Sequence, residues 1–170
     1  MDAQERRRGV ARCLEQAHGP VSATALAKEF GVSRQIIVGD VALLRAGGME
    51  ISATPRGYVL PAPTTGKKHT IACRHTAAQI EQELNAIVDQ GCTVLDVIVE
   101  HPVYGQITGP LQISSRYDVT QFVDLVTRQE AAPLAALTDG IHLHTVLCPD
   151  DGAFTRVKES LKQLDILLEE

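Results

Sequence analysis

The fold of this chain is decided around residues 93–100, which read TVLDVIVE. Val94, Val97 and Val99 lie among other apolar residues, so the run has almost no polar face. A short, continuously apolar run is typical of a strand in the interior of a sheet. We therefore expect residues 93–100 to form a central strand, with the rest of the second half of the chain arranged around it.

Alternating elements surround this strand. Further strands are expected at 68–73, 106–113 and 141–147, and helices at 76–90, 118–128 and 151–168. The resulting order βαββαβα predicts an α+β fold, namely a ferredoxin-like split βαβ sheet with an added helix, over residues 67–170. In that order, the first and last strands are expected to lie around the central pair rather than to form it. The fold alone assigns no function.

The first sixty residues predict a winged helix-turn-helix domain. Apolar spacing and caps indicate helices at 6–17, after Ser22, and from the N-cap Ser33 to about Arg45. Two strand-like pieces, 49–53 and 58–61, flank a Pro/Gly turn and form the wing. Residues 61–66, which read PAPTTG, have the composition of a linker between domains.

The start of the third helix carries the side chains expected to bind DNA. In this type of domain that helix enters the major groove, and Ser33, Arg34 and Gln35 occupy its leading end. Arg can pair with guanine, Gln with adenine and Ser with phosphate, while Arg56 in the wing would meet the backbone or the minor groove. The alternative is a protein-interaction module of the same shape. Gly39 inside this helix costs about 1 kcal/mol relative to Ala, which suggests close approach to another backbone.

Charge is distributed unevenly along the chain. The net charge is −5, but residues 1–60 hold eight Lys/Arg against six Asp/Glu, and residues 61–170 hold eight against fifteen. A mildly basic first part followed by an acidic second part suits a DNA-binding domain joined to a second domain with another function. The four cysteines are scattered, and there is neither a secretory signal nor an apolar run that could span a membrane. We expect a cytoplasmic protein with reduced thiols.

Histidines suggest a metal site. His142 and His144 are two residues apart on a predicted strand, so their side chains point to the same face. They are about 6–7 Å apart along the strand. His75 and the helix-borne Glu83 are further candidates, although a helical spacing would separate them by about 12 Å, so His75 must lie off the helix. Three imidazoles and a carboxylate favour zinc, nickel, copper or iron. The alternative is that each is a solvated or capped surface residue. His101 and Tyr104, in a turn, are more often structural than ligand-binding residues.

Catalysis has little support in the sequence. There is no recognisable nucleophile motif, Gly-rich phosphate loop or His-Glu-x-x-His pattern. The sequence therefore predicts a protein that is not an enzyme.

Several blocks of sequence resemble a known family. Residues 73–76 (CRHT), 97–105 (VIVEHPVYG) and 140–145 (GIHLHT) are similar to the three histidine blocks of the 3H domain. Residues 32–35 (VSRQ) and 53–58 (ATPRGY) resemble the winged head that precedes that domain. The combination, which covers nearly the whole chain, resembles the nicotinate-responsive repressors of NAD biosynthesis.

The resemblance implies a homodimer that binds a palindromic operator when nicotinic acid is abundant, ahead of genes for NAD synthesis or niacin uptake. It implies a nickel or zinc ion on His75, Glu83, His142 and His144, with the effector site formed around His101 and Tyr104. Two other readings remain open. One is a metal-responsive regulator for which the ion is the signal, and the other is a metal-dependent enzyme with a DNA-binding head.

Overall fold

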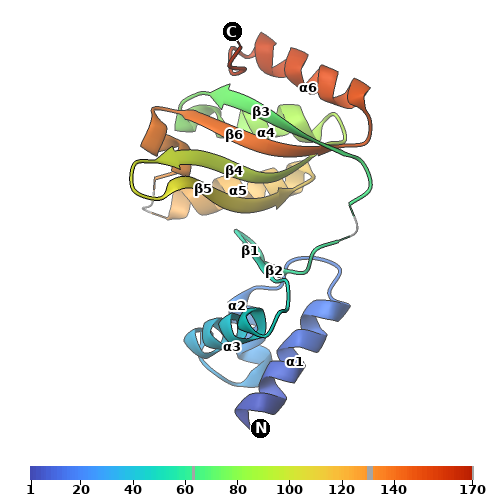
Figure 1. Ribbon diagram of the computed structural model, residues 1–170, viewed down its shortest axis with the longest axis vertical. Coiled ribbons are helices and arrows are strands. Elements are labelled where there is room, and N and C mark those ends of the chain that lie inside the picture. Colours follow the sequence, from blue (N-terminus) through green and yellow to red (C-terminus); the bar gives the residue numbers. More distant parts are fainter. Residues whose placement is uncertain (63, 130–131, 170) are drawn as a thin grey trace. The chain divides into compact units, whose positions relative to one another are not determined.

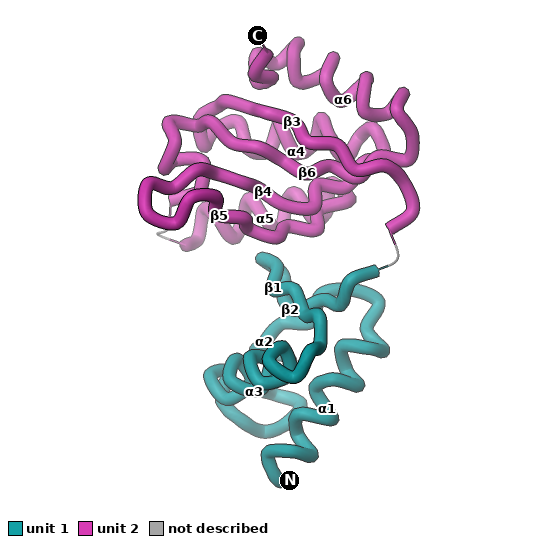
Figure 2. Tube along the Cα trace, in the orientation of Figure 1, with its two compact units in different colours: residues 1–63 teal, residues 64–170 magenta. Residues whose placement is uncertain are grey.

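The computed structural model describes residues 1–62, 64–129 and 132–169. The chain divides into two compact units, Met1–Pro63 and Thr64–Glu170 (Figure 2). Each unit has its own cluster of buried apolar side chains. Within the described ranges, every helix is too short or too polar to cross a bilayer.

Three helices and a hairpin form the first unit (Figure 1). They are α1 (Ala3–Gln16), α2 (Ala23–Phe30), α3 (Arg34–Ala46), β1 (Ser52–Thr54) and β2 (Gly57–Val59). Each helix begins at a polar residue whose side chain accepts backbone N–H groups, and these caps are Asp2, Ser22 and Ser33. The first helix starts at Ala3 instead of Arg6 because Asp2 and Glu5 form a capping box. The expected three helices and wing are confirmed.

The wing is tied to the segment ahead of α2. Tyr58 in β2 and Val21 exchange both backbone hydrogen bonds, at 2.9 and 3.0 Å. Both wing strands are shorter than the expected 49–53 and 58–61. The first starts late because the Met49 N–H bonds to the Leu44 carbonyl and thereby belongs to the end of α3. The wing is therefore a small hairpin anchored to the segment that precedes α2.

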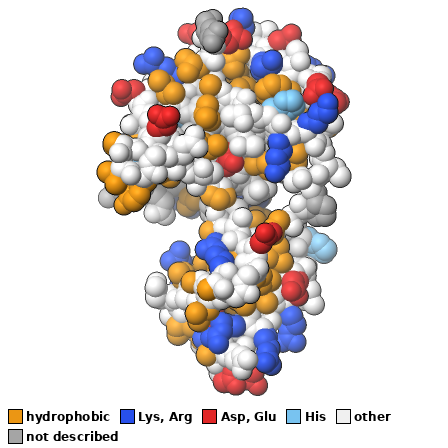
Figure 3. Space-filling view, viewed as in Figure 1, with side chains coloured by type: hydrophobic (Ala, Val, Ile, Leu, Met, Phe, Trp, Pro, Cys, Tyr) orange, Lys and Arg blue, Asp and Glu red, His pale blue; other side chains and the backbone are white. Residues whose placement is uncertain are grey.

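The second unit is a four-stranded sheet with helices on one face. Its elements are β3 (Lys67–Arg74), a 3-10 turn η1 (Ala77–Gln79), α4 (Ile80–Val88), β4 (Thr93–His101), β5 (Gly105–Ile113), α5 (Arg116–Arg128), η2 (Leu134–Thr138), β6 (Ile141–Cys148) and α6 (Asp151–Gln163). In Figure 1, α4 and α5 lie behind the sheet. The main core of apolar side chains fills the space between the sheet and the helices. The opposite face, seen in Figure 3, carries apolar side chains among charged ones.

The strand order is β3-β6-β4-β5, with neighbouring strands antiparallel. The expected order of elements is confirmed, and β4 is an inner strand as the run at 93–100 predicts. The expected place of the last strand is wrong, because β6 lies inside the sheet between β3 and β4. Its side chains are therefore enclosed from both sides, and His142 and His144 are each 3% exposed.

The C-terminal helix is shorter than the expected 151–168. It ends at Gln163, and Asp165 adopts a left-handed conformation with φ 58°. The chain then runs along β3, where the Arg74 N–H bonds to the Ile166 carbonyl at 2.8 Å and the Leu168 N–H to the Ala72 carbonyl at 3.0 Å. The leucines keep a helical spacing beyond Gln163, and this spacing led to the longer expected helix. The backbone leaves the helix there because its N–H and C=O groups pair with the exposed edge of β3 instead. The helix expected at 76–90 likewise begins as the turn η1.

Candidate metal centre and DNA-binding surface

Glu83 is the centre of a buried group of histidines. It lies in the first turn of α4 and is 2% exposed. Its carboxylate oxygens lie 2.5 Å from His75 Nε2, 2.8 Å from His142 Nε2 and 3.3 Å from His144 Nε2. The structure thus brings together all four residues that the sequence singles out as metal ligands, from α4, from β6 and from the segment after β3.

His75 reaches Glu83 because it is not helical. The strand β3 ends at Arg74, and Thr76 caps η1 through a capping box with Gln79, so the chain turns between His75 and α4. Gly140, with φ 87°, packs against the backbone of His75, where a Cβ would collide. A glycine is therefore required ahead of β6, and the close approach brings β6 and His75 together.

Each of the three imidazoles is fixed by a backbone carbonyl at its Nδ1 atom. His75 Nδ1 lies 2.7 Å from the Thr76 carbonyl, His142 Nδ1 2.8 Å from that of Gly140, and His144 Nδ1 2.7 Å from that of Asp96. A carbonyl oxygen only accepts hydrogen bonds, so each Nδ1 carries a proton. Each Nε2 is left facing Glu83, which is the arrangement that orients metal-binding histidines in proteins.

A cation fits between these groups. In neutral imidazoles protonated on Nδ1, three Nε2 lone pairs would face a carboxylate, which is unfavourable unless a proton or a metal ion lies between them. His144 Nε2 is buried and has no hydrogen-bond partner in the described part of the chain, since its position 3.3 Å from the carboxylate is not hydrogen-bonding geometry. Three nitrogens and a carboxylate suit a first-row transition ion. The residues therefore fit the metal that the resemblance implies.

The ionisation of the group follows from this geometry. Burial by itself lowers the pKa of His75 and of His144, but Glu83 outweighs it, through a hydrogen bond and charge at His75 and through its charge at His144, and raises both pKa values above 6.5. Burial opposes ionisation of Glu83, yet the charge of His144 and the hydrogen bonds from His142 and His75 hold the pKa of its carboxyl well below 4.5. Protons thus stabilise the carboxylate when no metal does.

Metal affinity is expected to fall with decreasing pH from a point above 6.5. A metal must displace the protons that His75 and His144 bind more tightly than a free imidazole does. For each proton displaced, the affinity should drop up to about tenfold per pH unit. Competition titrations with a chromogenic chelator at a series of pH values measure this. An affinity that is constant between about pH 6 and pH 8 would contradict the expected ligand set.

Cys73 is a buried neighbour of the group that the sequence reasoning missed. Its sulfur, a Glu83 carboxylate oxygen and a His142 ring nitrogen all lie within 4.8 Å of one another. Burial, and then the charge of Glu83, raise the pKa of the Cys73 thiol. Its position at the end of the expected strand, two residues before His75, was the signal available in the sequence.

His101 ends β4, and Tyr104 lies in the turn between β4 and β5. His101 Nδ1 accepts the backbone N–H groups of Val103 and Tyr104, at 3.1 and 3.3 Å, so it caps the turn. Tyr104 is 76% exposed. Two cavities adjoin the centre, and neither of the two residues lines them. One, of about 320 Å³, is lined by Ile98, Val99, Glu100, Gln106, Thr138, Ile141, His142 and Leu143. The other, of about 220 Å³, lies beside His75 and Gly140.

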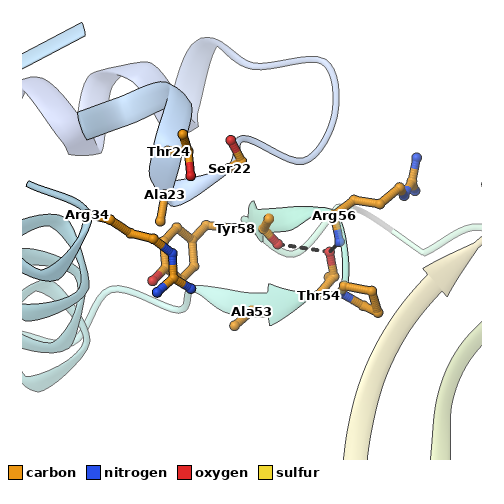
Figure 4. Close-up of a pocket in the computed structure, with 10 residues that line it drawn as sticks. Ser22, Ala23, Thr24, Arg34, Ala53, Thr54, Arg56 and Tyr58 are labelled. Atoms are coloured by element: carbon orange, nitrogen blue, oxygen red, sulfur yellow. Dashed lines mark hydrogen bonds between the residues drawn. The ribbon is translucent and has the colours of Figure 1, made fainter. Parts of the chain in front are cut away.

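Two of the four residues expected to bind DNA line a cavity of about 200 Å³ in the first unit (Figure 4). The cavity lies between the start of α2, the start of α3 and the wing, and Arg34 and Arg56 are among its lining residues. In Figure 4, the Arg34 side chain lies beside Tyr58, whereas Arg56 points away from the cavity. Gln35 is exposed, and the Ser33 hydroxyl accepts the Ile36 N–H as an N-cap. The structure thus places Arg34 against the wing and not along the outer face of α3.

Known proteins match both units. A family model of an HTH domain matches residues 6–59, and a model of the 3H domain matches residues 68–170. The probable transcription repressor NiaR of Thermotoga maritima is 44% identical over 167 residues, which cover 98% of this chain and 95% of that protein. The transcription repressor NadR of Bacillus subtilis is 40% identical over 162 residues, covering 92% and 89%. Both carry names of repressors and not of enzymes, as the sequence predicts. The chain therefore belongs to the family of DNA-binding transcription repressors in which an HTH domain precedes a 3H domain.

Proposed function

We propose that this repressor acts in the cytoplasm on genes for NAD biosynthesis or niacin uptake, with nicotinic acid as its co-repressor and a nickel or zinc ion in its second unit. The observation that carries the proposal is the convergence of three Nε2 atoms on the buried carboxylate of Glu83. Such a group is costly in the interior unless a cation balances it. Its place in the regulatory half of a DNA-binding protein supports a sensing role.

His75, Glu83, His142 and His144 would hold the metal. A bound divalent ion supplies positive charge and open coordination positions for a carboxylate such as that of nicotinic acid. The cavity of about 220 Å³ is a suitable place for the ring, because the proposed ligand His75 lines it together with the apolar Ile80 and Pro133. Burial of a flat, apolar ring against these side chains would add to the attraction between charges.

His101 and Tyr104 remain our proposed effector residues, through the turn that follows the strand lining the other cavity, of about 320 Å³. Glu100 lines the cavity and precedes His101 in β4. The ring of Tyr104 lies 5.1 Å from that of His101 and is otherwise exposed. Contact with an effector would require the β4–β5 turn to fold over the cavity, which exposed turns can do at little cost.

The first unit would bind a palindromic operator as part of a homodimer. Two copies related by a twofold axis place their recognition helices in successive major grooves, one helical turn apart. Gln35 is free to reach base edges, while Arg34 and Arg56, beside the N-terminus of α2, suit phosphate groups. Nicotinic acid would favour the arrangement of the dimer whose helix spacing matches the operator.

Gly39→Ala is expected to stabilise the protein and weaken operator binding. Gly39 is exposed in the middle of α3, and a Cβ there would meet nothing within 4 Å. The free energy of unfolding should rise by about 0.5–1 kcal/mol, because alanine is the better helix former. If Gly39 allows close approach of DNA, the added methyl group should reduce operator affinity about tenfold or more. Urea unfolding and fluorescence anisotropy measure the two effects.

Gly9→Ala is the contrasting substitution in the same unit. A Cβ at Gly9 would lie 2.6 Å from the ring of Phe30, so this glycine is explained by packing between α1 and α2. Gly9→Ala should therefore destabilise the unit, while Gly39→Ala does not. Unchanged operator affinity of Gly39→Ala would show that α3 does not approach DNA at this residue.

A two-by-two binding experiment tests the proposed co-repressor. Operator DNA is first selected by the protein from random sequence. Its affinity is then measured for metal-loaded and for chelator-stripped protein, each with and without nicotinic acid. We expect tight binding only with both metal and nicotinic acid. Tight binding with metal alone would favour the second reading, a regulator for which the ion is the signal.

A further inference from the structure

Cys73 belongs to the wall of the centre. It lies in β3 directly opposite His142 of β6, and its side chain is 0% exposed. Directly opposite residues of an antiparallel pair have Cβ atoms about 4.5–5.5 Å apart on the same face. Its sulfur is within 4.8 Å of both a Glu83 oxygen and a His142 nitrogen. Two of the four candidate ligands are therefore its immediate neighbours.

These separations suit a shared ion. A zinc ion lies about 2.3 Å from a sulfur ligand and about 2.0–2.1 Å from a nitrogen ligand, so the two ligand atoms of a tetrahedral site are roughly 3.5 Å apart. A small rotation of side chains would close the remaining distance. The adjacent His144 Nε2 is buried and without a hydrogen-bond partner among the described residues, so it is free to coordinate the same ion.

The other cysteines have different surroundings. Cys92 and Cys148 contact each other, with their sulfurs 2.8 Å apart, and Cys13 hydrogen-bonds Glu29 at 3.2 Å. Among the described residues, Cys73 is the cysteine grouped with a histidine and a carboxylate. A buried thiol needs no such partners to fill a core, so its position within this group is the informative observation.

We propose that Cys73 is a further ligand of the centre, which contributes sulfur to a site otherwise made of nitrogen and oxygen. The inference rests on the metal site of the proposed function. On binding, the thiol loses its proton to solvent and the thiolate sulfur donates its electron pair to the ion, with no change of oxidation state. A thiolate makes the site prefer zinc and other thiophilic ions over manganese or magnesium.

Cobalt(II) absorption spectroscopy of the full-length protein tests the proposal. A thiolate ligand adds a sulfur-to-cobalt charge-transfer band in the near ultraviolet, whereas imidazole and carboxylate ligands give only the weaker visible bands. We expect both sets of bands in the wild type. Cys73→Ser should lose the near-ultraviolet band and keep the visible bands. Cys92→Ala, which removes an equally buried thiol away from the centre, should keep both.

Metal preference gives a second readout that a merely structural role would not change. Cys73→Ser should lower zinc affinity at least about tenfold, the lower limit for removing even an outer-shell partner, and leave manganese affinity nearly unchanged. Visible bands without a near-ultraviolet band in the wild type would overturn the role of Cys73 alone. If cobalt gave no spectrum at all, both this inference and the proposed metal site would fail. If Cys73→Ser folds poorly, the affinities of the wild type for zinc and for manganese are compared instead, because a thiolate ligand predicts a strong preference for zinc.

Discussion

Glu83→Gln is expected to abolish stabilisation of the protein by metal. The wild type, with metal at one hundred times its dissociation constant, should gain about 2.7 kcal/mol in free energy of unfolding. Glutamine is similar in shape but neutral, so it provides neither a charged ligand nor the counter-charge for His75 and His144. Without metal, removal of the carboxylate should destabilise the second unit by up to about 3–5 kcal/mol, as when one partner of a buried ion pair is removed.

Urea unfolding with zinc, with nickel and with a chelator measures these changes. Glu81→Gln is the matched control, because Glu81 lies in the same first turn of α4 but is exposed. That variant should retain both the stability and the response to metal. A Glu83→Gln protein that metal still stabilises by as much as the wild type would remove Glu83 from the ligand set.

Arg34→Ala combined with Arg56→Ala is expected to weaken operator binding strongly and to reduce its dependence on salt. Both residues line the cavity at the start of α2, where phosphate groups of DNA would find positive charge and the free N–H groups of a helix. Each arginine that no longer neutralises a phosphate should lower the slope of log affinity against log salt by about 0.9. The slope of the double variant should therefore be smaller by about two.

Anisotropy titrations at several salt concentrations measure this slope. Lys28→Ala is the control, because Lys28 is an exposed cation in the last turn of α2, at the opposite end of the helix from the cavity. It should leave the slope nearly unchanged. If the double variant bound one operator sequence more weakly but others equally well, with an unchanged slope, the two arginines would contact bases and not phosphates.

Much of the centre could be predicted from local sequence. Alternation along β6 places His142 and His144 on one face, and the inner position of β6 explains why that face is fully buried. Caps and turns predicted the helices of the first unit because those signals act within a few residues. The spacing between His75 and Glu83, awkward for a helix, is resolved by the turn η1, which a local hydrophobic pattern does not reveal.

Other features depend on contacts between distant segments. The place of β6 in the sheet is decided by pairing with both β3 and β4, which no single stretch encodes. The end of α6 depends on the free edge of β3, and the grouping of Cys73 with Glu83 depends on the packing of α4 over the sheet. Arg34 also illustrates this limit, since its contact with the wing follows from how the hairpin folds back.

We propose that the second unit senses nicotinic acid through a metal held by His75, Glu83, His142 and His144. The most direct test is one titration, in which nicotinic acid is added to metal-loaded protein while the affinity for selected operator DNA is followed by anisotropy. We predict that the affinity rises and reaches a plateau as nicotinic acid saturates. An operator affinity that is unchanged across saturating nicotinic acid would contradict the account.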